Sequence, residues 1–412
     1  MAVVLLIPSF LDSLRVVFGI RLMSLFAVSL CLVAWLTKAF SARKFAIQPS
    51  SLYFLLVLFG AASFLSVTSP IGSPLLKLYR AASFLYTRLF IVFLLINSIR
   101  TLAQVRRTMY LVIGLGAFSA LIALWQFWMY QQTGLNYSFA QDEQTFRITS
   151  EGTFLRATAL AADPNEIGIH MVVAGIWCLY LGLATRGFRP LARVAHYLAF
   201  LILAGGVIVT FSRSALLSLL IAVIMVYVTT AFLTRPSWTP GIASLLGVSV
   251  LGAVMIGGLL DHPHIFGVVP EDVLWRIDLN RIGVRAVLEN PLTGVGVDAF
   301  TNYDNPYDLA VHNLFIQIAA EMGIPGLLVF TILVGSVGVR LVIATWQSSD
   351  SRIRSVLAAL TLGYGAKLLS HLSTPILTDL LFWFYVGLSE AALIVYRSGN
   401  TNGNGAADLG HQ

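Results

Sequence analysis

The sequence predicts an all-α integral membrane protein with about 12 transmembrane helices of ordinary length. Of its 412 residues, 58% are hydrophobic and only 11% are charged, whereas soluble domains carry roughly 25% charged residues. The apolar residues also gather into long runs, and a spanning helix needs about 20 such residues. A water-soluble globule could not cover this much apolar surface. The composition therefore excludes a soluble enzyme, a nucleic-acid-binding domain and a disordered chain.

The apolar runs divide the chain into candidate spans in order. They lie at residues 2–20, 22–40, 51–67, 81–97, 108–130, 163–184, 194–211, 214–233, 241–260, 325–345, 354–372 and 379–396. Long connections remain at 131–162 and 261–324. We therefore expect membrane helices over 1–260, a large loop over 261–324, further membrane helices over 325–397 and a flexible tail over 398–412.

Basic residues predict how the chain crosses the membrane. The net charge is +7, and alternate short loops carry arginines and lysines with few acidic residues beside them. These residues are Arg43, Lys44, Arg100, Arg106, Arg107, Arg186, Arg189, Arg193, Arg235, Arg352, Arg354 and Arg397. Because cytoplasmic loops are enriched in Lys and Arg, we expect this side and both termini in the cytoplasm. The two long connections then lie on the opposite, external face.

The largest loop contains a predicted helix with three arginines. The segment 271–291 reads "EDVLWRIDLNRIGVRAVLENP", and its basic residues are Arg276, Arg281 and Arg285. Guanidinium groups near a membrane surface suit a phosphate or pyrophosphate, which they grip with two hydrogen bonds. The spacing equally fits helix-surface ion pairs, namely Asp272–Arg276, Asp278–Arg281 and Arg285–Glu289. Spacing alone leaves both interpretations open.

A second motif in this loop offers a candidate base. Residues 311–326 read "VHNLFIQIAAEMGIPG", in which Asn313, Gln317 and Glu321 form a polar stripe beside His312. Histidine can take a proton near neutral pH, although a lone loop histidine is more often structural. Its presence in the same loop as the arginines favours a catalytic role. The glycine and proline at 323 and 325 should break the chain before the next spanning helix.

Further charged residues fall close to or within the apolar runs. Arg213, in "TFSRSA" at 210–215, either snorkels at a helix end or points into an external cavity. Arg88, Lys367 and His371 lie near the outer ends of spans, with Lys77 and Arg80 just outside. Intramembrane ionisable groups need partners, and the candidates are Asp163, Glu166 and Asp379. The set forms either an internal salt-bridge network or a site for an anionic lipid head group.

Several of these motifs together resemble the O-antigen ligase and O-antigen polymerase superfamily. The similar stretches are "RIDLNRIGVRAVLENPLTGVGVDAF" and "AVHNLFIQIAAEMGIPGLLVF". They hold an arginine-bearing helix, a Pro-Leu-x-Gly-Val-Gly turn, a His-Asn pair and a Glu-x-Gly-x-x-Gly sequence. "FSRSA" and "DPNEIG" resemble further family motifs. One departure is Asn280, where many members carry an aromatic residue four positions after the helix arginine.

The resemblance implies a GT-C-type glycosyltransferase in the bacterial inner membrane, with its active site facing the periplasm. The donor would be a glycan on undecaprenyl pyrophosphate. The acceptor would be a lipid A–core sugar in a ligase, which we favour slightly, or another lipid-linked repeat unit in a polymerase. A non-enzymatic transporter of lipid-linked polysaccharide is the alternative from another class. Membrane lipids are expected partners and nucleic acids are not.

The residues and the resemblance together suggest roles. His312 would be the general base, and Arg276 and Arg213 would bind the pyrophosphate. Further substrate contacts are expected from Arg281, Arg285, Asn313, Lys77, Arg80 and Arg88, with support from Glu321 and Gln317. The scheme calls for no cofactor and no metal, because pyrophosphate is a good leaving group. Walker, HExxH and DxD motifs are absent from the sequence.

Overall fold

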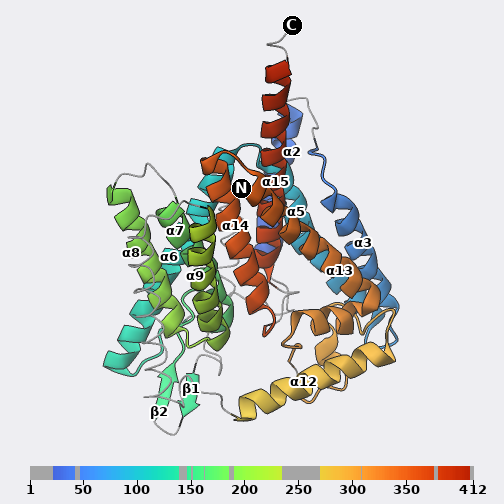
Figure 1. Ribbon diagram of the computed structural model, residues 1–412. Coiled ribbons are helices and arrows are strands. Elements are labelled where there is room, and N and C mark those ends of the chain that lie inside the picture. The colour runs from blue at the N-terminus through green and yellow to red at the C-terminus, as the bar shows by residue number, and fades with distance from the viewer. Residues whose placement is uncertain are drawn as a thin grey trace.

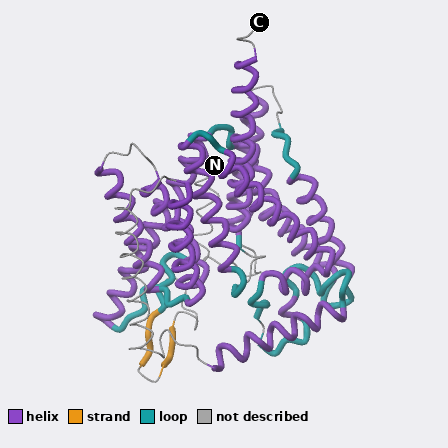
Figure 2. Tube along the Cα trace, viewed as in Figure 1, coloured by secondary structure: helices purple, strands orange, loops and turns teal. Residues whose placement is uncertain are grey.

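The computed structural model describes residues 22–41, 47–138, 146–149, 152–161, 163–184, 190–233, 270–307, 309–374 and 379–408 (Figures 1 and 2). Its α-helices are α2 (Leu22–Ser41), α3 (Leu52–Leu65), α4 (Pro74–Phe84), α5 (Phe90–Ser98), α6 (Leu102–Thr133), α7 (Pro164–Ala184), α8 (Pro190–Val209), α9 (Arg213–Leu233), α12 (Pro270–Glu289), α13 (Leu314–Gln347), α14 (Ser351–Ser370) and α15 (Leu380–Asp408). Shorter elements are η1 (Ser66–Thr68), the π-helical η2 (Leu85–Leu89), η4 (Phe300–Asn302) and the antiparallel strands β1 (Phe146–Thr149) and β2 (Gly152–Leu155).

The helices confirm a multi-pass membrane protein. Within the described ranges, seven helical segments are long and apolar enough to cross a bilayer. They are Pro74–Ser98, Leu102–Thr133, Pro164–Ala184, Pro190–Val209, Arg213–Leu233, Leu314–Gln347 and Leu380–Ser398. The predicted spans at 2–20 and 241–260 lie outside the described residues. The total of about 12 spans and the layout of the loops therefore stay predictions.

Three element boundaries differ from those expected. The run at 81–97 begins earlier, at Pro74, because proline fits the first turn of a helix, and α4, η2 and α5 continue into one another. Lys77 and Arg80 therefore lie within a helix and not outside it. The helix α13 begins at Leu314, ahead of the predicted run at 325–345, and its backbone is non-helical at Gly323. The last helix, α15, continues to Asp408 through most of the predicted tail, since extending a helix costs less than starting one.

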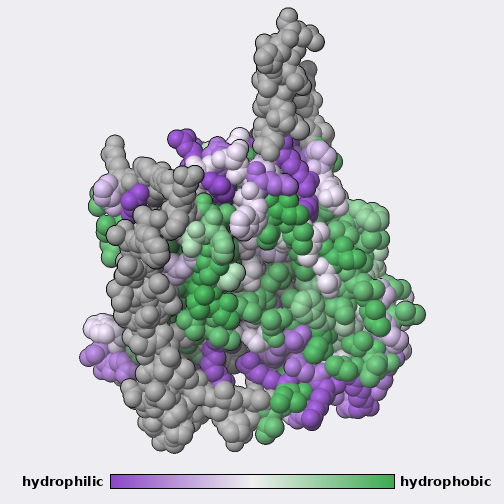
Figure 3. All heavy atoms as spheres, viewed as in Figure 1, coloured by the Kyte–Doolittle hydropathy of each residue, from purple (hydrophilic) through white to green (hydrophobic). Residues whose placement is uncertain are grey.

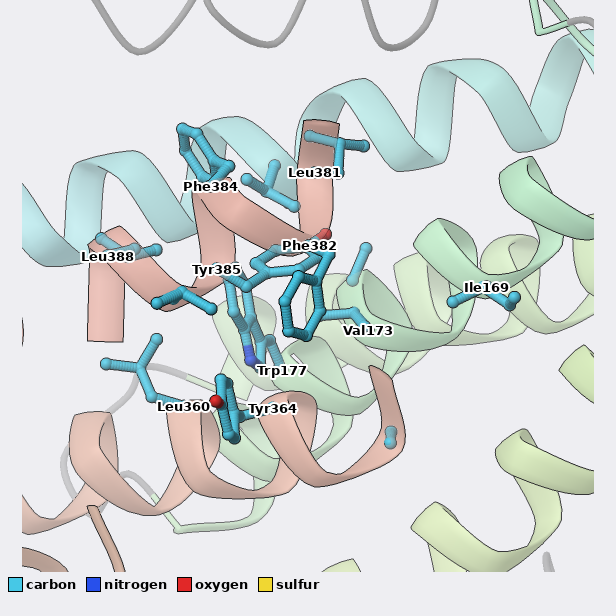
Figure 4. Packing of buried hydrophobic residues seen from close by; sticks show 14 of the residues in the cluster. Ile169, Val173, Trp177, Leu360, Tyr364, Leu381, Phe382, Phe384, Tyr385 and Leu388 are labelled. Carbon is cyan, nitrogen blue, oxygen red and sulfur yellow. The ribbon is translucent and has the colours of Figure 1, made fainter. Parts of the chain in front are cut away.

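The bundle is built around α7, which is almost wholly buried. Apart from Asn165, Glu166 and His170, its residues are mainly apolar on every face, as expected of a helix surrounded by others. In the core shown in Figure 4, the Trp177 and Tyr385 rings pack edge to face at 5.5 Å. Close contact with α14 requires Gly363, where an added Cβ would lie 2.3 Å from the Trp177 indole nitrogen. Figure 3 shows hydrophobic side chains across the middle of the visible face and hydrophilic ones toward its ends.

One end of the bundle gathers the non-spanning elements. The helix α12 crosses this end at a steep angle to the spanning helices, and the β1–β2 hairpin lies at the same end (Figure 1). The junction of α8 with α9 and the last turn of α14 also reach it. The described parts of the two long connections are therefore on one side of the protein. That this side is periplasmic stays a prediction from the positive-inside rule.

Candidate active site

The helix α12 has two faces with different roles. Leu279 and Ala286 are fully buried, and Gly283 lets Ile316 approach so closely that an added Cβ would lie 2.7 Å from its Cγ2. This face therefore packs against the start of α13. The opposite face is exposed to solvent. Side-chain exposure there is 77% for Arg281.

The exposed arginines form the helix-surface ion pairs that spacing suggested. Arg281 lies 3.5 Å from Asp278, and Arg285 lies 2.8 Å from Glu289. Glu289 also accepts a hydrogen bond from the Tyr303 hydroxyl at 2.5 Å. The hydrogen bonds from Tyr303 and Arg285 hold the pKa of Glu289 below its usual value. These contacts confirm two of the three predicted pairs. A substrate-binding role for Arg281 and Arg285 stays a prediction.

Arg276 lies on another face of α12 and contacts the bundle. It is about 140° round the helix from Arg281. Its Nη1 donates a hydrogen bond to the Ser373 carbonyl oxygen at 3.5 Å, and its Cζ lies 5.1 Å from the centre of the Trp275 ring. Ser373 belongs to the turn that follows α14. Arg276 thus links the predicted loop helix to the end of a buried helix.

His312 adjoins the same groups. Its ring packs edge to face on Trp275 at 5.1 Å and hydrogen-bonds to the backbone of Ser373. Burial, and then the charge of Arg276, lower the pKa of His312 to about 4, against the opposing effect of the Ser373 bond. The imidazole is therefore neutral at pH 7. Its Nδ1 is buried and has no hydrogen-bond partner within the described part of the chain.

The turn after α14 receives donors at three successive carbonyl oxygens. The backbone N–H of Leu314 donates to His371 at 3.0 Å, the Asn313 amide donates to Leu372 at 3.5 Å, and Arg276 donates to Ser373. Asn313 also caps α13, because its side-chain oxygen accepts from the N–H groups of residues 315 and 316. The turn therefore orients α12 and the start of α13 together.

The two glycine motifs of the loop pack backbone against backbone. Val295 N–H donates to the Ala320 carbonyl at 2.8 Å, and Ile324 N–H donates to the Pro291 carbonyl at 2.8 Å. Gly294 and Gly323 have φ angles of 62° and 70°, which glycine adopts without strain. An added Cβ at Gly294 would lie 2.4 Å from the Glu321 carbonyl carbon. Tertiary contact thus explains why both segments carry glycine, and Gly323 makes the predicted break in α13.

Lys77, Arg80 and Glu321 meet at the same glycine turn. Glu321 is buried and accepts from the Asp298 N–H at 2.5 Å and from Gln317 at 3.3 Å. Arg80 donates to the Asp298 carbonyl at 2.5 Å. Lys77 donates to the Ser69 carbonyl, and its stem would lie 2.8 Å from a Cβ at Gly296. These contacts fasten α4 to the loop. Direct binding of substrate by Lys77 or Arg80 stays a prediction.

The remaining predicted arginines lie elsewhere in the bundle. Arg88 is buried in the π-helical turn η2 and donates to the Thr87 hydroxyl. Arg213 is the first residue of α9, which begins at the same end of the bundle as α12 (Figure 1). The preceding turn places Phe211 at a φ of 49°. Arg156, which the sequence did not single out, donates to the Thr210 carbonyl at 3.3 Å. A catalytic part for Arg213 stays a prediction.

The loop and its flanking helices match a known family. Residues 198–331 match the family model described as O-antigen ligase. Over these residues the chain is similar to the O-antigen ligase superfamily. This similarity points to a membrane glycosyltransferase or ligase and does not separate ligases from polymerases. No curated protein matches the chain.

One similar solved structure is described as "Structural coordination of polymerization and crosslinking by a peptidoglycan synthase complex". Its TM-score to this chain is 0.43 at 18% sequence identity. The alignment covers 84% of this chain and 96% of the other.

Buried charged residues form a network beside the site. Lys367 Nζ lies 2.5 Å from Asp379, and His371 lies 2.9 Å from the same carboxylate. These contacts confirm Asp379 as the expected partner of both residues. Asp163 instead accepts from the Asn165 N–H at the start of α7. His170, which the sequence did not single out, lies 3.3 Å from Lys367.

Glu166, His170 and Asp379 are close enough to be considered as metal ligands, since their ligand atoms lie within 4.8 Å of one another. The lysine contact argues against this. An ammonium group only donates hydrogen bonds, so the His170 Nδ1 that faces Lys367 must be the acceptor. The Nε2 of the neutral ring then carries its proton and has no lone pair for a metal. The residues therefore fit an ion-pair network.

Sequence analysis did not identify two members of the site. Trp275 contacts both Arg276 and His312, and its position beside an arginine was the one available signal, since tryptophan is a favoured cation–π partner. Ser373 acts through its backbone, and no side-chain motif reveals a carbonyl oxygen. Its distance along the chain from the loop also conceals the contact.

Proposed function

We propose that the protein transfers a glycan from undecaprenyl pyrophosphate to a lipid A–core sugar at the periplasmic face of the inner membrane. The observation that carries this proposal is the meeting of Arg276 and His312 at the backbone of Ser373. A fixed positive charge beside a neutral imidazole suits a reaction in which one group leaves as an anion while another loses a proton. Similarity to the O-antigen ligase superfamily supports the class of reaction.

His312 is the base in this scheme. Its neutral ring accepts the proton of the acceptor hydroxyl while that oxygen forms a bond to the anomeric carbon of the donor sugar. The bond from the anomeric carbon to the phosphate oxygen breaks at the same time, and the electron pair leaves with undecaprenyl pyrophosphate. Direct attack inverts the anomeric configuration. General-base assistance of this kind contributes about 10²–10⁴ in rate.

Arg276 stabilises the leaving pyrophosphate. Its Nη1 is held by the Ser373 carbonyl oxygen at 3.5 Å, and a guanidinium has five N–H donors, so it can also bind a charged phosphate oxygen. Contact with Trp275 helps to hold the guanidinium in this position. Arg213, at the same end of the bundle, supplies a second positive charge. Removing one such positioned donor typically costs about 10²–10³ in rate.

The test is reconstitution of the purified protein in liposomes with a lipid-linked glycan and lipid A–core. Formation of the glycosylated core together with free undecaprenyl pyrophosphate is the expected result. Elongation of the lipid-linked glycan in the absence of lipid A–core would instead indicate a polymerase. Movement of the lipid-linked glycan across the bilayer without release of undecaprenyl pyrophosphate would indicate a transporter and overturn the proposal.

A further inference from the structure

The turn after α14, residues 370–374, has polar contacts on two sides. Its backbone carbonyls receive the donors from α12 and α13 described above. In the bundle interior, the His371 ring lies 2.9 Å from Asp379 through Nε2 and 3.0 Å from the Thr374 hydroxyl through Nδ1. His371 and Asp379 are 2% and 3% exposed. The buried His371 side chain therefore links the turn to the start of α15.

The partners of Asp379 define the hydrogen-bond directions. Its carboxylate receives Lys367 at 2.5 Å and the N–H groups of Leu381 and Phe382 at 2.9 and 3.1 Å. An ionised carboxylate only accepts, so His371 Nε2 donates to it. The His371 Nδ1 lies 3.0 Å from the Thr374 hydroxyl, which also donates to the Ser370 carbonyl oxygen at 3.1 Å. The lysine charge balances the aspartate, and His371 links the turn to Asp379.

We propose that His371 is a positioning residue for Arg276 and His312, acting through the backbone of this turn. Its own carbonyl holds the N–H of Leu314 at 3.0 Å, two residues after His312. The Ser373 carbonyl of the same turn contacts Arg276 and His312. Releasing the imidazole from Asp379 frees the turn to shift, and both groups shift with it. The catalytic consequence rests on the proposed function, whereas the structural consequence does not.

Paired variants separate the two contacts of the ring. In His371→Gln, the amide nitrogen can occupy the place of Nε2 and donate to Asp379. In His371→Asn, the shorter side chain can reach Thr374 but not Asp379. Because the Asp379 bond crosses to another helix, the glutamine variant should keep the turn in place and the asparagine variant should release it.

A buried ion pair elsewhere in α15 provides the matched control. Arg340 lies 2.8 Å from Glu390, which is 0% exposed. This pair joins α13 to α15 and is not among the described contacts of the turn. Glu390→Gln should lower the melting temperature without loosening the turn. If His371→Asn and Glu390→Gln loosened the turn to the same extent, His371 would contribute only general stability.

Hydrogen–deuterium exchange of the full-length protein in detergent micelles is the activity-independent readout. In His371→Asn, peptides covering 270–281 and 309–318 should exchange about tenfold faster, as expected when a buried hydrogen bond is lost. His371→Gln and Glu390→Gln should match wild type in these peptides. Wild-type exchange in His371→Asn, or faster exchange in Glu390→Gln, would overturn the proposal.

Kinetics connect the positioning to the reaction. In the reconstituted transfer assay, His371→Asn should lower kcat by about tenfold or more with little change in KM, since misplacing reacting groups slows the chemical step. If wild type transfers no glycan, the proposed function fails while exchange still decides the positioning. Should His371→Asn not fold, His371→Leu replaces it. That variant keeps much of the side-chain volume, leaves the Lys367–Asp379 pair in place and removes both hydrogen bonds of the ring, so the same exchange increase is expected and its absence counts against the proposal.

Discussion

Arg276 and His312 come from different elements of the large loop, and both contact the backbone of Ser373. Ser373 follows a buried helix outside that loop. The guanidinium and the imidazole are thus oriented by the membrane-embedded bundle and not by the loop alone. Trp275 contacts both of them.

Replacing His312 by glutamine should abolish efficient transfer. Glutamine retains a polar side chain but cannot take up the proton, so kcat should fall by about 10²–10⁴. The measurement is glycan transfer by reconstituted protein, with intact folding checked by gel filtration. Turnover at the wild-type rate would assign the base to another residue.

Activity should respond to acid in a defined direction. The pKa of His312 is lowered to about 4, so the ring is unprotonated across the neutral range. The rate should be flat from about pH 8 to pH 6 with respect to this group and should fall as pH approaches 4. A rate profile governed by an ionisation near pH 6.5 would show that burial and the charge of Arg276 do not lower the pKa of the base.

Stability should also depend on His312. Its pKa is lower in the folded protein than its ordinary value of 6.5, so the unfolded chain binds the proton more readily. Stability is therefore unaffected by this group above pH 6.5 and is lost as pH falls from there toward 4, by about 3 kcal/mol in all. As the pH falls through this window, the melting temperature of wild type should fall more than that of His312→Gln. Parallel curves would contradict the lowered pKa.

Arginine substitutions should separate the two faces of α12. Arg276→Ala should cost about 10²–10³ in rate, while Arg281→Ala should cost less than Arg276→Ala because Arg281 is exposed and paired with Asp278. Arg352→Ala, in an exposed position of α14, controls for the loss of one positive charge. If Arg281→Ala lost more activity than Arg276→Ala, the pyrophosphate site would be assigned to the exposed face of α12.

Gly323 should not tolerate a side chain. Its φ of 70° and ψ of −178° are open only to glycine, and a Cβ would lie 2.6 Å from the Leu292 carbonyl oxygen. Gly323→Ala should destabilise the protein by about 2 kcal/mol or more. In the same helix, a Cβ at Gly335 meets nothing within 4 Å, so Gly335→Ala should be neutral or stabilising. Thermal unfolding in detergent compares them, and equal melting temperatures would refute the packing argument.

Sequence reasoning located most of the helices and the principal motifs. Apolar runs reveal spans because a bilayer imposes length and composition on any segment that crosses it. The same reasoning misplaced the start of the helix at Pro74, since its first turns are partly polar. It also left Arg281 and Arg285 open between ion pairs and anion binding, because both uses need the same spacing.

What the sequence determined by itself was the membrane class, the motifs of the superfamily and the residue types available for chemistry. These follow from composition and local order along the chain. Tertiary structure alone decided that Ser373 receives Arg276, that Asp379 pairs with both Lys367 and His371, and that the glycines at 294 and 323 pack against opposing backbone. Such contacts depend on how helices distant in sequence approach one another. The role of a carbonyl oxygen or of a missing Cβ is therefore set by the segment that packs against it in the folded protein.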